Sequence, residues 1–133
     1  MKIKLFFSFL LTVNLLMAQT KHTGWTNKNY KLSGTWSLQK INGQDYFVLE
    51  NDFKTSDGPD LKVFLLEKEI DKVGENEAVD KQGVFLGDLK SFTGAQRYAI
   101  PKNIDLSKYH SIVIHCKKYT VVWGGVNLND TVK

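Results

Sequence analysis

From residue 32 onward the sequence consists of short apolar runs, separated by turn residues at intervals of about ten. The runs are rich in β-branched and aromatic residues, as strands are. This rhythm is typical of sandwiches and barrels. We therefore predict an all-β fold, an antiparallel β-sandwich or barrel-like single domain. The predicted strands are a hairpin at 35–50 and runs at 61–66, 84–89, 96–100, 111–116 and 119–128.

Turn residues and face patterns define several of these elements more closely. Asn42-Gly43 supplies the two positive φ angles of a type I′ turn, so a hairpin is expected around it. Residues 61–66 are apolar on both faces apart from Lys62, which predicts a central strand. Residues 67–81 are highly charged with few large apolar groups, and we expect a solvated loop with room for one helical turn. Gly124-Gly125 permits a bulge or tight bend.

The amino-terminal residues have the order of a secretory signal peptide. Lys2 and Lys4 precede an apolar stretch at 5–17, and Ala18 supplies a small residue at the expected cleavage point. The stretch is shorter than the roughly 20 residues of a membrane span, and a retained anchor is the alternative. We expect an exported protein, periplasmic or secreted, with no transmembrane anchor after cleavage. The expected organisation is a signal peptide at 1–18, a polar, loosely packed lead-in at 19–31, a β domain at 32–129 and a tail at 130–133.

Charge and motif content exclude several functions. Without residues 1–18, Lys plus Arg falls from 18 to 16 against 14 acids, so the expected mature chain is only weakly basic. That balance does not predict the strongly basic surface that nucleic-acid binding requires. The dinucleotide, P-loop, zinc-protease, nucleophile-elbow, CxxC and haem-attachment motifs are all missing from the sequence. An enzyme is therefore the less favoured class.

Cys116 is the single cysteine, so the chain cannot form an internal disulfide. Strand alternation places Cys116 on one face with Ile112 and Ile114, and His115 on the other. Imidazole and thiolate are good ligands for zinc, copper or haem iron, but neighbours on a strand cannot readily bind one metal ion. The alternative is a structural role, in which Cys116 is a small buried apolar side chain.

Aromatic and acidic residues offer further candidates. Trp123 and Tyr98 could support a redox site or stack on a ligand, but in a small β domain such residues normally form the core. The acidic set Asp52, Asp57 and Asp60 could bind calcium, although turn chemistry explains each of them. Cys116 is thus the redox candidate, with His115, Trp123 and Tyr98 as possible supporting residues. The sequence identifies no cofactor, and both haem and a metal remain possible.

The order of several short motifs resembles the DM-thirteen domain family, found in the Skeletor protein and in bacterial exported proteins. The resemblance runs from Gly34 to Leu128. It implies an all-β fold with one cysteine, matched by Cys116, that has been proposed to act in redox chemistry. Some relatives join this domain to haem-binding DOMON modules and membrane b-type cytochromes. The matching motifs are Gly34-Thr35-Trp36, Asn51-Asp52-Phe53, Gly58-Pro59-Asp60-Leu61, Val63-Phe64-Leu65, Leu86-Gly87-Asp88-Leu89-Lys90, Gly94-Ala95-Gln96-Arg97-Tyr98, Ile100-Pro101, Val113-Ile114-His115-Cys116-Lys117 and Val121-Val122-Trp123-Gly124.

Three hypotheses follow from the residues and the resemblance together. The leading one is an exported electron-transfer or redox-group-binding domain in which Cys116 reacts, with a redox partner protein. Its rival is a non-catalytic binding or adhesion module in which Cys116 is part of the core. A thiol-dependent catalyst comes third, because thiol exchange would need an external partner. His115 departs from the family pattern, in which relatives tend to carry an aromatic residue.

Overall fold

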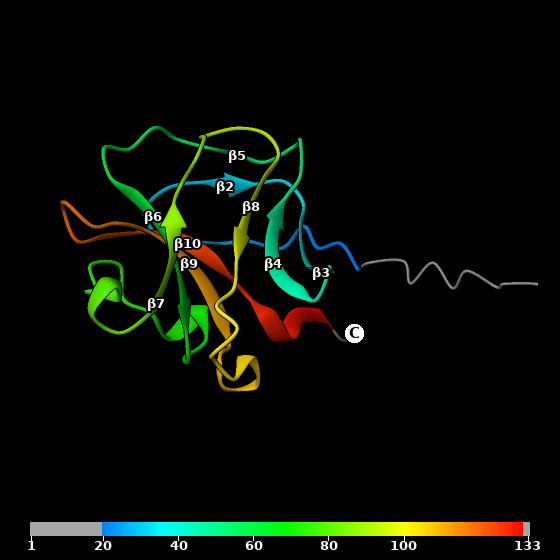
Figure 1. Cartoon of the computed structure of the whole chain (residues 1–133). Helices are drawn as coiled ribbons and strands as arrows, with labels where there is room; N and C mark the ends of the chain where they lie inside the picture. The colour runs from blue at the N-terminus through cyan, green and yellow to red at the C-terminus, as the bar shows by residue number, and fades with distance from the viewer. Residues whose placement is uncertain (1–19, 132–133) are drawn as a thin grey trace, which may run out of the picture.

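The computed structural model describes residues 20–131, which form an all-β fold of short antiparallel strands (Figure 1). The predicted signal peptide at 1–18 lies outside the described residues. Within them, no helix is long and apolar enough to cross a bilayer. The strands are β1 (Thr26–Asn27), β2 (Leu32–Ser33), β3 (Trp36–Ile41), β4 (Gln44–Leu49), β5 (Lys54–Thr55), β6 (Leu61–Leu66), β7 (Val84–Asp88), β8 (Gln96–Ala99), β9 (Ser111–Cys116) and β10 (Val121–Asn127).

The strands build three sheets, with orders β1-β10-β9-β6-β7, β3-β4-β8 and β2-β5. None of these sheets closes on itself in the described part of the chain, so of the two predicted architectures the structure matches the sandwich. The predicted all-β antiparallel class is confirmed. Four short 3-10 turns complete the chain: η1 (Ile70–Lys72), η2 (Val79–Lys81), η3 (Leu106–Lys108) and η4 (Leu128–Thr131).

The five-stranded sheet is centred on β6 and β9. Strand β6 pairs with β9 on one side and β7 on the other, which confirms its predicted central place. In the three-stranded sheet, β3 and β4 form the predicted hairpin. Asn42 has a φ of 50° and Gly43 a φ of 78°, the pair of positive values that a type I′ turn requires.

The main core lies between the two larger sheets. Trp36 and Phe47 enter it from the three-stranded sheet, while Val63 and Ile114 enter it from β6 and β9. All four side chains are almost completely buried. Burial of a large apolar side chain stabilises a fold by about 1.5–3 kcal/mol. This core is therefore the main source of stability and the environment in which Cys116 lies.

The charged segment 67–81 is not the solvated loop that its composition predicted. It forms η1 and η2, and it buries Ile70, Val73 and Val79 against the outer face of the five-stranded sheet. These residues meet Phe64 and Val113 there, in a second apolar cluster. The physical reason is that β6 and β9 are apolar on both faces, so the outer face needs a cover as well.

The lead-in also differs from its expected loose packing, because its strand β1 pairs with β10. A Cβ atom added to Gly124 would lie 2.4 Å from the Thr26 carbonyl oxygen, so the missing side chain makes this close approach possible. The Trp25 indole N–H donates to the Gly34 carbonyl at 2.8 Å. The predicted irregularity at Gly124-Gly125 is confirmed, since the β9–β10 register shifts between Val122 and Gly124.

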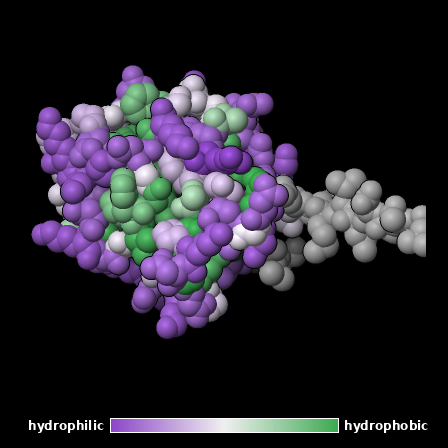
Figure 2. Space-filling view, viewed as in Figure 1, coloured by the Kyte–Doolittle hydropathy of each residue, from purple (hydrophilic) through white to green (hydrophobic). Residues whose placement is uncertain are grey.

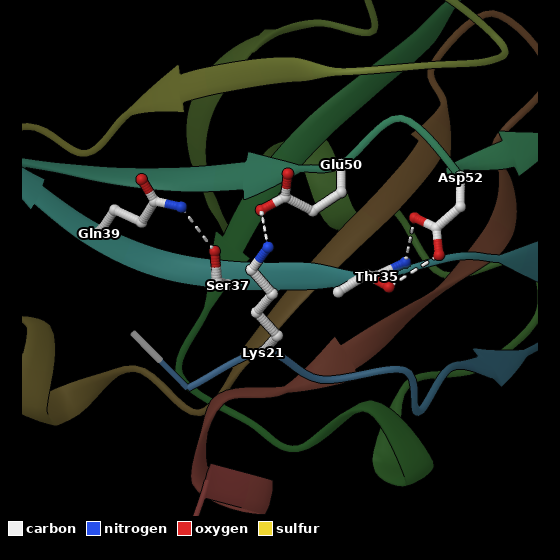
Figure 3. A network of polar contacts seen from close by, with 6 residues as sticks. All are labelled: Lys21, Thr35, Ser37, Gln39, Glu50 and Asp52. Carbon is white, nitrogen blue, oxygen red and sulfur yellow. Dashed lines mark hydrogen bonds and ion pairs between the residues drawn. The ribbon is translucent and has the colours of Figure 1, made fainter. Parts of the chain in front are cut away.

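Polar side chains fix the corner where the lead-in meets β3 (Figure 3). The Asp52 carboxylate accepts hydrogen bonds from the Thr35 backbone N–H at 2.8 Å and from the Thr35 hydroxyl at 2.7 Å. These bonds lower the pKa of Asp52. Nearby, Lys21 forms an ion pair with Glu50 at 3.6 Å. The Asp52 carboxylate therefore has a turn-stabilising role, as the sequence suggested.

Replacement of Gly34 should reveal how tightly this corner is packed. Gly34 has a φ of +105°, and a Cβ there would lie 2.6 Å from the Asp52 carbonyl oxygen. Gly34→Ala should lower the free energy of unfolding by about 2–5 kcal/mol, from backbone strain and steric overlap together. Chemical denaturation measures this change.

Gly94→Ala is the matched control for that prediction. Gly94 has a φ of +90°, but a Cβ added there would meet no other atom within 4 Å, so its substitution tests strain alone. We expect a cost of about 1–3 kcal/mol at Gly94. Equal costs at both glycines would show that the close approach of residues 52 and 53 to Gly34 adds nothing to the loss in the free energy of unfolding.

Candidate functional site

Cys116 is the last residue of β9, and it faces the main core. The free thiol side chain is 1% exposed and belongs to the same apolar cluster as Ile112 and Ile114. Its cross-strand partners are Leu61 on β6 and Val121 on β10. The predicted burial and shared face of Cys116 are confirmed. A thiol in such surroundings is inert toward large reagents in the closed state.

An exposed turn begins directly after the thiol. Residues 117–120 are all exposed, and Thr120 has a positive φ of 52°. The sequence placed Tyr119 in the strand predicted at 119–128, which is wrong: β10 begins at Val121, and Tyr119 is 62% exposed in the turn. Strand ends beside exposed turns open at low free-energy cost. Cys116 therefore lies directly beside a segment that is expected to open locally.

Trp123 lies on β10 and is 3% exposed. A Cβ on Gly58 would lie 2.7 Å from Cζ2 of Trp123 and 2.9 Å from Cδ2 of Leu61, so the indole and Leu61 both pack at Gly58. Leu61 is the cross-strand partner of Cys116. The indole N–H donates to the Ser56 carbonyl at 3.4 Å. Trp123, Leu61 and Cys116 thus belong to one apolar cluster, in which Leu61 is a neighbour of both other residues.

Tyr30 is the residue that sequence reasoning missed. Its ring stacks on Trp123 with centroids 3.8 Å apart and an interplanar angle of 22°, while its side chain is 43% exposed. The pair therefore reaches from the buried indole to solvent. The available signal was an aromatic residue within a polar stretch between Asn29 and Lys31. That signal is weak, because isolated exposed aromatics are common.

Tyr98 belongs to the same core cluster but comes from β8 in the opposite sheet. Its hydroxyl donates to Oε1 of Gln96 at 2.5 Å and accepts from the Lys90 backbone N–H at 2.9 Å. Burial raises the pKa of Tyr98 to about 12. The phenol therefore stays neutral and anchors the chain segment that follows β7.

His115 lies on the outer face of the sheet, opposite to Cys116. Its side chain is completely buried, and it meets Phe64 edge-on at 5.9 Å. Among the described residues neither ring nitrogen has a hydrogen-bond partner. Burial lowers the pKa of His115, and the nearby Asp80 charge and Glu77 backbone offset this only in part. A neutral imidazole behind the sheet cannot serve as the cation that activates the thiol.

The structure brings no metal centre together in the part that it describes. Within residues 20–131, no three His, Cys, Asp or Glu side chains are arranged to hold a metal ion. Cys116 and His115 point to opposite sides of one sheet and cannot ligate the same iron or zinc. Of the acidic set, Asp52 is engaged by Thr35 and Asp60 pairs with Lys62 at 3.2 Å.

The family model described as electron transfer DM13 matches residues 24–128, which include Cys116, Trp123 and Tyr30. The chain belongs to this family. No curated protein and no solved structure matches. The DM13 match covers nearly all described residues and begins inside the predicted lead-in, in agreement with the pairing of β1. Membership supports a redox-related role.

The buried imidazole predicts a specific pH dependence of stability. Because the folded pKa of His115 lies below its unfolded value of about 6.5, the unfolded state binds the proton first as the pH falls. The free energy of unfolding should therefore decrease from about pH 6.5 downward. Urea denaturation of wild type and His115→Phe between about pH 5 and 7 measures this.

His115→Phe keeps a planar ring but removes both nitrogens that lack partners. We expect the variant to be more stable at pH 7, by about 1–3 kcal/mol, and to lose the decline between about pH 5 and 7. The other histidines are common to both proteins, so the difference isolates residue 115. Parallel pH profiles for the two proteins would contradict this account of His115.

Proposed function

We propose that the chain is an exported electron-transfer domain, periplasmic or secreted, in which Cys116 is the redox-active side chain. Family membership supports the redox role, and Cys116 is the single cysteine of the sequence. The observation that carries the proposal is the series Cys116, Leu61, Trp123 and Tyr30, which connects the buried sulfur with an exposed aromatic ring. We expect a redox partner protein at the exposed end of the series.

One-electron chemistry fits this geometry better than thiol exchange does. Exchange requires a second sulfur to reach Sγ of Cys116, but the chain has no second cysteine and the thiol is buried. An electron can pass through packed side chains without such contact. When the thiol gives one electron to an oxidised Trp123, its S–H bond breaks and a sulfur radical forms. The proton leaves to water through the opened turn at 117–120.

Flash photolysis tests this step directly. A photogenerated tris(bipyridine)ruthenium(III) complex removes one electron from surface aromatic residues and is reduced to ruthenium(II). In the wild type, the tryptophan radical should decay as Cys116 becomes oxidised. In Cys116→Ala, the same radical should live at least several times longer. Transient absorption gives the lifetimes, and equal lifetimes in the two folded proteins would reject the redox role of Cys116.

Cys116→Ser is the conservative control for stability. A serine hydroxyl in this apolar cluster lacks a partner, so we expect a loss of about 1–3 kcal/mol in the free energy of unfolding. The serine variant must be compared below its unfolding transition. If it is folded and its tryptophan radical has the wild-type lifetime, the thiol has a structural role only.

A second candidate function is a non-catalytic binding or adhesion module. Figure 2 shows hydrophobic residues gathered on the face that carries β7 and β8 in Figure 1, within a mostly hydrophilic surface. Phe85 on β7 is 52% exposed, and contiguous apolar patches of this kind mark contact surfaces. This patch favours a contact surface, and the burial of Cys116 is compatible with it. The radical-lifetime experiment separates the two functions, because the binding module predicts no effect of Cys116→Ala.

A further inference from the structure

An open pocket of about 410 Å³ lies beside the stacked aromatic pair. Strands β2 and β5 form its walls with the chain that follows β5. We call it the Lys31–Lys54 pocket. Its lining residues are Lys31, Ser33, Lys54, Thr55, Ser56 and Asp57.

Two direct connections join this pocket to the aromatic pair. The Ser56 carbonyl, in the pocket lining, accepts the hydrogen bond from the Trp123 indole. Tyr30, which stacks on Trp123, directly precedes Lys31 in the chain. The pocket lining therefore adjoins the aromatic pair, although neither ring is itself part of the lining.

The charge of the pocket is positive. Lys31 and Lys54 lack a carboxylate within ion-pair distance among the described residues, whereas Lys62, elsewhere on the surface, is held by Asp60 and Asp88. Asp57 is a lining carboxylate that opposes the two lysines. The backbone beneath them is fixed, because Leu32 pairs with Thr55 and the Thr55 hydroxyl donates to the Lys31 carbonyl at 3.0 Å. The lysines are thus available to an outside anion.

We propose that the Lys31–Lys54 pocket docks the acidic face of a redox partner protein and holds that partner against Tyr30. The inference rests on the proposed function, because it names the partner class for the same electron-transfer series. Electron-transfer encounters use small, transient interfaces. Complementary charges orient such encounters and raise their rates.

The pocket fits a protein face better than it fits a small ligand. Sites for small molecules are concave and largely apolar, so that they enclose most of the ligand. This pocket is open, and apart from its backbone its lining consists of lysine, serine, threonine and aspartate side chains. An acidic polypeptide surface is complementary in charge to the two lysines of the lining.

Nuclear magnetic resonance with two anionic probes tests the proposal on the folded chain. Hexacyanochromate(III) is a paramagnetic anion that does not exchange electrons under these conditions, and a hexaglutamate peptide represents an acidic protein surface. Both probes should affect the backbone signals of Lys31, Lys54 and Ser56 and the ring signals of Tyr30. The effects should weaken at high salt, as screened charges require.

Charge-removing variants identify the groups responsible. Lys31→Gln with Lys54→Gln should weaken hexaglutamate binding about three- to tenfold. Lys118→Gln is the control, because Lys118 lies beside an exposed tyrosine ring elsewhere on the surface, with Nζ 5.3 Å from the centroid of Tyr119. This control should bind as the wild type does. Equal weakening by both substitutions, or probe effects centred on Tyr119, would overturn the proposal.

Two further outcomes separate the parts of the inference. Binding of hexacyanochromate(III) without binding of hexaglutamate would assign the pocket to a small anion and overturn the protein partner. Cys116→Ala should leave hexaglutamate binding unchanged. If docking is confirmed while the radical lifetime does not depend on Cys116, the proposed redox role fails and the docking surface stands.

Discussion

The pairing of β6 with β9 at the centre of the five-stranded sheet is the constraint on which the other features depend. Both strands are apolar on the two sides of the sheet, so each side requires a cover. The three-stranded sheet covers one side, and the segment with η1 and η2 covers the other. Strand alternation then determines that Cys116 and His115, adjacent in the chain, belong to two separate cores.

This separation assigns different physical roles to the two residues. The thiol has an apolar environment and lies directly before an exposed turn. The imidazole is buried without partners and stays neutral. Protonation of His115 is therefore expected to destabilise the packing of the outer cover. Trp123 belongs to the same core as Cys116 and stacks on the half-exposed ring of Tyr30.

The sequence predicted the longer strands but not the two-residue strands β1, β2 and β5. It also predicted the type I′ hairpin, the central place of β6 and the opposite faces of Cys116 and His115, because each depends on local spacing. It did not predict the cover formed by residues 67–81, since three apolar residues scattered among charges have no clear period. The stacking of Tyr30 on Trp123 was also beyond prediction. That contact joins segments far apart in the chain and depends on the close approach that Gly58 and Gly124 permit.

The pairing of β1 with β10 has a consequence for the order in which the molecule is assembled. Thr26 and Asn27 find their partners at Gly125 and Gly124, far along the chain. Contacts between such distant segments carry a loop-closure cost and form late. A chain that emerges from its amino terminus must therefore hold β1 unpaired until β10 has emerged. The edge of the sheet beside Trp123 is completed last, and with it the stacked pair.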